Sequence, residues 1–127
     1  MQVLIVDNSI AIIERIEELL LDTVSNLSVV SATCYLEAVA ILQQALPDII
    51  LLDGYLPNNL SLQLVKEIKQ YTDTNIIILQ NCNDDCMRSR YLSMGVDYIL
   101  DKYLDFTTIP AIIRHISIIK LQVVPTL

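Results

Sequence analysis

The chain has 127 residues, 54% of them hydrophobic, and a formal net charge of −7 from 15 acidic and 8 basic side chains. This length and composition favour a single domain with one packed core over a disordered chain. The acidic balance disfavours binding to a nucleic-acid backbone, because such binding depends on lysine and arginine side chains that neutralise phosphates.

No apolar run approaches the roughly 20 residues that a membrane span requires. The N-terminus enters an apolar run at Val3 without the basic flank and cleavage site of a signal peptide. We therefore expect a cytoplasmic protein without a membrane partner. In that compartment the three cysteines are expected to be reduced thiols, and a zinc site is disfavoured because it needs four ligands.

Five short runs of mostly apolar, often β-branched residues predict strands that are buried on both faces of a parallel sheet. In chain order they cover residues 3–6, 27–32, 48–52, 75–79 and 98–100.

Helical patterns alternate with these runs. The first helix follows Ser9, a residue type that caps helix N-termini, and buries a face that includes Ile16 and Leu20. The others cover residues 36–45, 60–71, 84–94 and 108–120. Pro47 ends the second helix, Gly95 ends the fourth, and Pro110 is tolerated in the first turn of the fifth.

Five successive strand–helix units predict an α/β fold, with a doubly wound, five-stranded parallel sheet and five helices. We expect the flavodoxin-like strand order 2-1-3-4-5, which is taken from known folds of this kind. One domain is expected over residues 1–120. The C-terminal tail, residues 121–127, is too short to be an output domain.

Polar residues stand at the carboxyl ends of the predicted strands, where open α/β sheets form their sites. They are Asp7, Asn8, Asp53, Gln80 and Lys102. In the expected order the first and third strands are neighbours, about 4.8 Å apart, so the two aspartates converge. Their repulsion can be relieved by a cation, and Mg²⁺ prefers oxygen ligands. With Lys102 nearby, such a pocket suits phosphoryl transfer.

Each of these residues also has an ordinary structural explanation. Asp7 could cap the first helix, Asp53 could form a turn, and Lys102 could be a solvated surface residue. Singly, these explanations are the stronger ones. Jointly they are weaker, because all three residues fall at strand ends that the fold brings together.

Three segments carry a resemblance to a known family: LIVDNS (4–9), PDIILLDGYLP (47–57) and GVDYILDK (95–102). With them the sequence resembles the receiver domains of two-component signalling, as an atypical stand-alone member. The resemblance extends from the first strand to the fifth helix.

The resemblance implies a role for each matched position. Asp53 is implied to be the phospho-acceptor, and Lys102 to contact the phosphoryl group. Asp7 and Asn8 match the acidic pair that holds Mg²⁺, and the backbone carbonyl of Tyr55 matches a further ligand of the metal, which Asp53 also binds.

Several positions depart from the family pattern. Asn8 removes a charge from the metal site, so Mg²⁺ affinity should fall. Gln80 occupies the place of a Thr or Ser whose hydroxyl bonds the phosphoryl oxygen, and Ile99 occupies the place of an aromatic switch residue. Tyr103 replaces a proline, and Ser61 a loop glycine.

The leading hypothesis is a single-domain response regulator. It would accept a phosphoryl group on Asp53 from a histidine kinase or phosphotransfer protein, and signal by contact with a downstream protein. It would not be an enzyme beyond assisting its own phosphorylation. The alternative is a pseudo-receiver, a binding module with weak or no phosphorylation. A phosphatase is disfavoured because the segment after the first strand lacks its second aspartate.

The fifth helix carries two apolar stripes. Ile109, Ile112, Ile113 and Ile116 are expected in the core, while Ala111, His115 and Ile118 form a second, partly exposed strip. Receivers of the resembling family often dock through the fourth helix, fifth strand and fifth helix. We therefore expect His115 and Ile118 in a contact with a partner or with a second copy of the chain.

Overall fold

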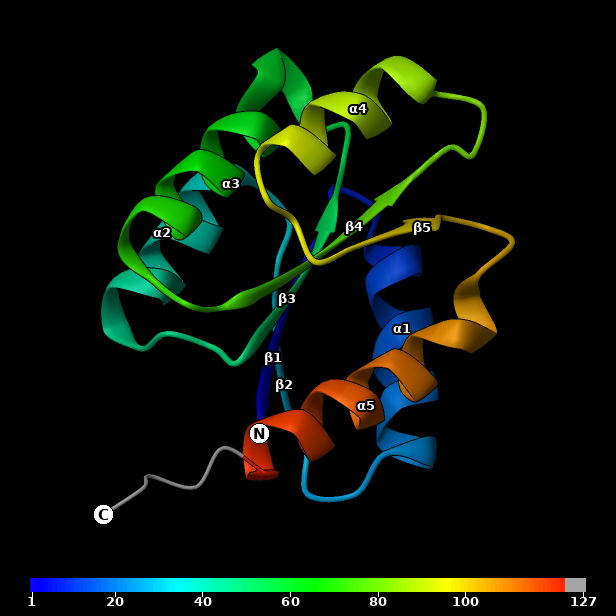
Figure 1. Ribbon diagram of the computed structural model, residues 1–127. Coiled ribbons are helices and arrows are strands. Elements are labelled where there is room, and N and C mark those ends of the chain that lie inside the picture. Colours follow the sequence, from blue (N-terminus) through cyan, green and yellow to red (C-terminus); the bar gives the residue numbers. More distant parts are fainter. Residues whose placement is uncertain (123–127) are drawn as a thin grey trace.

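The computed structural model describes residues 1–122, and the side chains of residues 1–120. It contains one five-stranded parallel sheet of order β2-β1-β3-β4-β5, which confirms the expected flavodoxin-like topology (Figure 1). In chain order the elements are β1 (Gln2–Val6), α1 (Ile10–Thr23), β2 (Ser28–Ala32), α2 (Tyr35–Gln44), β3 (Ile49–Asp53), α3 (Leu60–Tyr71), β4 (Asn75–Gln80), α4 (Asp85–Ser93), β5 (Tyr98–Asp101) and α5 (Ile109–Gln122).

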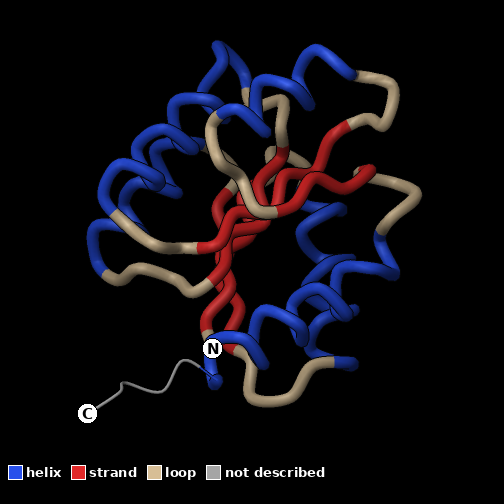
Figure 2. Tube along the Cα trace, in the orientation of Figure 1, coloured by secondary structure: helices blue, strands red, loops and turns tan. Residues whose placement is uncertain are grey.

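The sheet forms the middle layer, with α1 and α5 on one face and α2, α3 and α4 on the other (Figure 2). Each face of the sheet carries a hydrophobic core, and alternate residues of the three central strands pack into one core or the other. In β3, Ile49 and Leu51 pack toward α1 and α5, while Ile50 and Leu52 pack toward the opposite helices. All four are fully buried, which is why these strands are apolar without interruption.

The helix boundaries follow local signals in the sequence. Ser9 caps α1 by accepting a hydrogen bond from the Ile12 N–H at 3.4 Å. Gly95 follows α4 with a φ of 83°, a left-handed conformation that glycine adopts at little cost. Pro110 is the second residue of α5, where a missing N–H is harmless.

The faces of α5 agree with the expected stripes only in part. Ile109, Ile113 and Ile116 are buried, and His115 and Ile118 are exposed. Ile118, however, lines a hollow with the C-terminal end of α1. Ile118 therefore lies on the α1 side of α5, away from β5, and the expected contact through His115 and Ile118 stays a prediction.

A different residue of α5 lies on the side of β5. Ile119, 46% exposed, lines a hollow together with Asp97 and Tyr98. Helix α5 also continues to Gln122, so the first two residues of the expected tail are helical. The rest of that tail, residues 123–127, lies outside the described residues. Across residues 1–122 no helix combines the length and the apolar character that crossing a membrane requires.

Candidate functional site

Two buried aspartates lie side by side at the carboxyl end of the sheet. Asp7 directly follows β1, and Asp53 is the last residue of β3. The two strands pair in parallel with Val6 opposite Leu52, so the next residue of each strand brings a carboxylate to the same edge. Asp7 is 1% exposed and Asp53 3%. Two like charges this poorly solvated repel each other, and a nearby cation relieves the repulsion.

Lys102 supplies a positive charge between them. Its backbone N–H donates to the Gln80 carbonyl at 2.9 Å, which holds the residue just beyond β5. Its Nζ lies 2.9 Å from Asp7 Oδ2 and 3.4 Å from Asp53 Oδ2. The expected convergence of the two carboxylates and the lysine is thereby confirmed.

The surroundings shift the pKa values of this cluster. Burial raises the pKa of Asp53, and although the Lys102 charge lowers it, the carboxylate of Asp7 raises it further. Burial alone would lower the pKa of Lys102, but the hydrogen bond to Asp7 and the charge of Asp53 raise it overall. The ammonium therefore stays charged beside the two acids.

The donor set fits a hard cation such as Mg²⁺. Asp7 Oδ1 accepts the Ser9 N–H at 2.8 Å, while the buried Asp7 Oδ2 faces the Lys102 ammonium at 2.9 Å. Asp53 Oδ1 accepts the Tyr55 N–H at 3.1 Å. Residues 1–122 contain no cluster of three or more Asp, Glu, His or Cys side chains suited to a metal. Mg²⁺ keeps several waters, so two carboxylates and one or two further oxygens suffice as its protein ligands. Asn8, the expected additional ligand, is exposed.

Gln80 turns its amide toward α4. The side chain is buried, and Nε2 donates to the Asp84 carbonyl at 3.2 Å. Its Oε1 is buried and finds no hydrogen-bond partner among the described residues. In this arrangement Gln80 connects the end of β4 to the start of α4.

Two buried hydroxyls hold the backbone around Asp53. Ser61 Oγ donates to the Asp53 carbonyl at 2.6 Å and accepts from the Leu56 N–H at 2.9 Å. Tyr91 donates from its hydroxyl to the Gly54 carbonyl at 2.7 Å, and burial raises the pKa of that hydroxyl to about 12. At neutral pH it is therefore a permanent donor.

Neither role was predicted from the sequence. Ser61 was noted only as a departure from a glycine, and Tyr91 was not singled out. Of the other departures, Ile99 is partly buried and packs against the core on the α2–α4 side of the sheet, while Tyr103 is 63% exposed. The three cysteines are exposed and unpaired.

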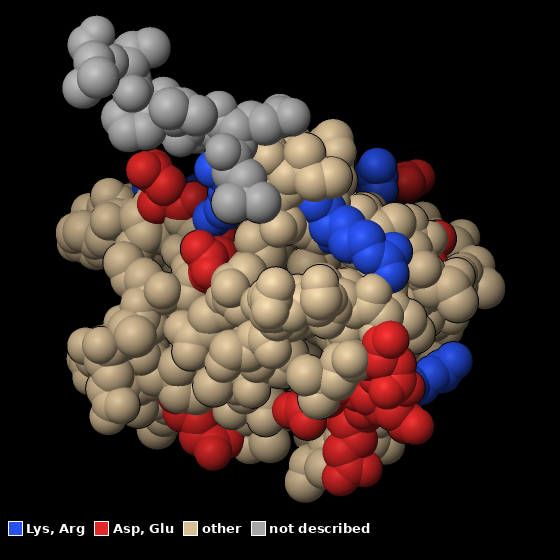
Figure 3. All heavy atoms as spheres, turned by 90° about the horizontal axis from the view of Figure 1, so that it is seen from below, with Lys and Arg blue, Asp and Glu red and all other residues tan. Residues whose placement is uncertain are grey.

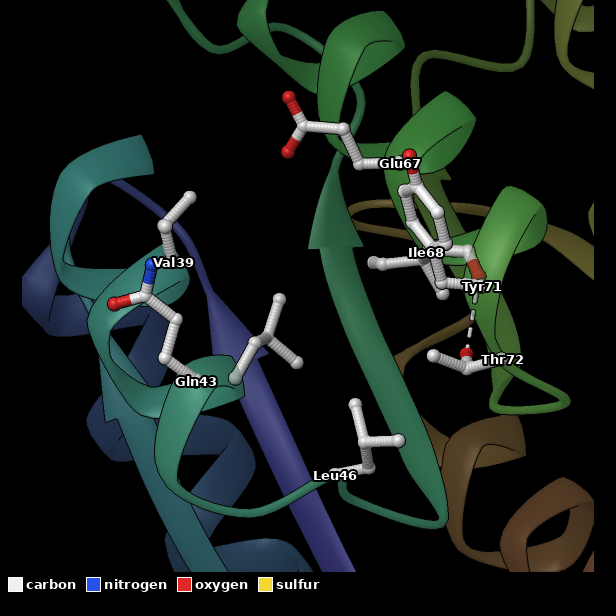
Figure 4. Close-up of a pocket in the computed structure, with 8 residues that line it drawn as sticks. Val39, Gln43, Leu46, Glu67, Ile68, Tyr71 and Thr72 are labelled. Atoms are coloured by element: carbon white, nitrogen blue, oxygen red, sulfur yellow. Dashed lines mark hydrogen bonds between the residues drawn. The ribbon is translucent and has the colours of Figure 1, made fainter.

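A mostly apolar cavity of about 250 Å³ lies between α2 and α3, away from the site (Figure 4). Val39 lines it from α2 and Ile68 and Tyr71 from α3. Leu46 and Thr72, which also line it, precede β3 and β4. The cavity is thus at the amino ends of these strands, opposite the aspartates.

Residues 3–114 match the family model of the response regulator receiver domain. The transcriptional regulatory protein YdfI of Bacillus subtilis (strain 168) is 35% identical over 95 residues, which cover 74% of this chain and 44% of that protein. The chain thus spans less than half the length of this relative.

Solved structures share the fold. The signal receiver domain of the DNA-binding response regulator merR from Colwellia psychrerythraea 34H superposes with a TM-score of 0.85 at 18% identity, covering 92% of this chain and 98% of that chain. The chemotaxis response regulator CheY4 of Vibrio cholerae superposes with a TM-score of 0.78 at 26% identity, covering 91% of this chain and 97% of that chain. With nearly the whole chain matched by the family model, this protein belongs to the response regulator receiver domain family.

Proposed function

We propose that this receiver accepts a phosphoryl group on Asp53 from a histidine kinase or phosphotransfer protein, and signals by contact with a downstream protein. One observation carries the proposal: the Lys102 ammonium lies within 3.4 Å of carboxylate oxygens of both Asp7 and Asp53. A buried acid beside a fixed ammonium can act as nucleophile while the cation stabilises the phosphoryl oxygens.

In the transfer, a carboxylate oxygen of Asp53 forms the new P–O bond as the P–N bond to the donor histidine breaks. The electron pair of that bond returns to the departing imidazole. Lys102 faces the charge that develops on the phosphoryl oxygens. Asp7, Asn8, Asp53 and the Tyr55 carbonyl would hold Mg²⁺, which would supply further positive charge to those oxygens.

Intact-mass measurement with acetyl phosphate and Mg²⁺ tests the acceptor. We expect wild type to gain one phosphate and Asp53→Asn to gain none. Asp48→Asn is the matched control, since Asp48 precedes β3 at its amino end and is solvent-accessible; it should gain phosphate as wild type does. Equal uptake by wild type and Asp53→Asn would overturn the assignment of Asp53.

A pseudo-receiver is the second candidate, and two observations favour it. Asn8 contributes no charge to the site, and the Gln80 amide donates to Asp84. We expect Mg²⁺ to bind more tightly to Asn8→Asp than to wild type, because a carboxylate adds a charge to the ligand set. Calorimetric titration measures this. No uptake of phosphate by wild type at saturating Mg²⁺ would establish the pseudo-receiver.

The output is proposed to be a protein contact. Acidic side chains outnumber lysine and arginine 15 to 8, and on the face in Figure 3 they form one larger group at the lower right and smaller groups elsewhere. Such a surface suits a protein partner better than a nucleic-acid backbone. We infer a contact, with a partner or in a homodimer, through α4, β5 and α5, on the side where Ile119 is exposed.

Analytical ultracentrifugation and pull-down of Ile119→Glu test this surface. The variant should weaken at least one association, because an unpaired charge in an interface is costly. Ile118→Glu, on the α1 side of the same helix, is the matched control. If only Ile118→Glu weakens association, the contact lies over α1 and α5.

A further inference from the structure

Helix α4 is weakly held to the rest of the domain. It has nine residues, and Tyr91 is its only buried side chain. A helix this short is marginal in water without tertiary contacts. Segments with few buried contacts populate alternative positions most readily. The position of α4 therefore depends strongly on the few polar contacts that it makes.

Two of these contacts run to the loop that follows Asp53, and tyrosine hydroxyls make both. From α4, Tyr91 donates to the Gly54 carbonyl at 2.7 Å. From the loop, Tyr55 donates to Asp84 Oδ2 at 3.0 Å. The other carboxylate oxygen of Asp84 caps α4 by accepting the Met87 N–H at 3.1 Å. Each segment thus holds the other through a tyrosine.

Tyr55 also bridges to the end of β4. Its hydroxyl accepts the Asn81 N–H at 3.1 Å, so it joins the loop, the segment before α4 and the helix cap. A hollow of about 320 Å³ lies beside these contacts, lined in part by Leu56 of the loop, Leu62 of α3 and Met87 of α4. The side chains of the loop and of α4 thus leave open space next to the two hydroxyl contacts.

The loop is in turn connected to the carboxylate of Asp53. The Tyr55 N–H donates to Asp53 Oδ1 at 3.1 Å. Phosphorylation would convert this carboxylate into an acyl phosphate, whose carbonyl oxygen is a weaker acceptor than an anionic oxygen. The hydrogen bond from the Tyr55 N–H would therefore weaken on phosphorylation, and the backbone of Gly54 and Tyr55 would shift with it.

We propose that Tyr55 and Tyr91 are positioning residues that couple the state of Asp53 to the position of α4. The proposal rests on the proposed function, because it requires phosphorylation at Asp53. It adds the contacts that would transmit the change. The Tyr55 N–H contacts Asp53 Oδ1, the Tyr55 hydroxyl contacts the α4 cap at Asp84, and the Tyr91 hydroxyl joins the buried face of α4 to Gly54.

Hydrogen exchange of the α4 amides tests the coupling in wild type, Tyr55→Phe and Tyr91→Phe. Each variant keeps the ring and loses one hydroxyl. Tyr71→Phe is the matched control, since its ring is 76% exposed on α3. Without phosphodonor, Tyr55→Phe should exchange about 2- to 10-fold faster at Asn81 and Met87 than the control, which is the fold-change of one lost hydrogen bond.

The decisive readout is the change on adding acetyl phosphate and Mg²⁺, with uptake measured by mass on the same samples. In wild type and Tyr71→Phe, the exchange rates of the α4 amides should change severalfold on phosphorylation. Compared at equal phosphate occupancy, as read from those masses, the two test variants should lose at least half of that response on a logarithmic scale. A merely structural role would speed exchange equally with and without phosphate, leaving the response intact.

The outcomes separate the two proposals. No uptake by wild type overturns the proposed function and, with it, this coupling. Uptake with an undiminished α4 response in both variants overturns the coupling alone. If Tyr91→Phe fails to fold, Tyr55→Phe decides, because the Tyr55 ring is 36% exposed and its hydroxyl is not needed in the core.

Discussion

Replacing Lys102 with methionine would remove the only cation described between two buried carboxylates. Methionine keeps most of the length of the side chain and loses its charge, so packing changes little. Asp7 and Asp53 would remain 1% and 3% exposed with their repulsion uncompensated. Removal of one partner from a buried ion pair typically costs about 3–5 kcal/mol. The lower end applies here, because one carboxylate can take up a proton.

We therefore expect Lys102→Met to lower the free energy of unfolding by about 3 kcal/mol at neutral pH. For a domain of this size that corresponds to about 10 °C in melting temperature. Urea unfolding without Mg²⁺ measures it. The control is Lys69→Met, which breaks a 3.1 Å pair with Asp97 whose side chains are 27% and 29% exposed. Exposed pairs contribute only about 0–1 kcal/mol.

Two further measurements sharpen the test. Adding Asp53→Asn to Lys102→Met should recover part of the lost stability, because the repulsion then disappears. Adding Mg²⁺ to Lys102→Met should do the same, since the cation can replace the ammonium between the carboxylates. The reasoning is refuted if Lys102→Met costs no more than Lys69→Met, or if neither treatment recovers stability.

Ser61→Ala should lower the free energy of unfolding in urea by about 2–3 kcal/mol, because it leaves the Leu56 N–H and the Asp53 carbonyl unpaired. A smaller loss than that of Ser9→Ala would contradict this. Ser9→Ala itself should cost about 0.5–1 kcal/mol through loss of the α1 cap, and no change at all would mean that the 3.4 Å contact does not form in solution. Burial raises the pKa of Asp53 in the folded state. Between the pKa values of the unfolded and the folded state, the folded protein therefore binds more protons than the unfolded chain. The contribution of Asp53 to the free energy of unfolding thus falls as the pH rises through that window. Asp53→Asn should lack this loss, and the stability of wild type relative to the variant should decline from acidic to neutral pH; a rising difference would contradict the shift.

The order of strands and helices could be predicted from the sequence because each element carries its own signal. The buried strands are unbroken apolar runs, and the predicted helix at 60–71 coincides with α3 (Leu60–Tyr71). The convergence of Asp7, Asp53 and Lys102 was also predictable, since parallel strands bring their carboxyl ends to one edge. Residue type and position at a strand end, together with a strand order taken from known folds, were sufficient for that part of the site.

Only the tertiary structure decided which neighbours the remaining residues meet. The spacing of Ile118 shows that it leaves the core stripe, but not that α1 lies on that side of α5. Tyr91 and Ser61 bond to backbone carbonyls, and since every residue has a carbonyl, the sequence carries no sign of these partners. Tyr55 and Asp84 lie 29 residues apart, and a loop and a helix cap meet only when the sheet has placed both. Periodicity determines the face of an element, whereas packing of the whole chain determines what that face contacts.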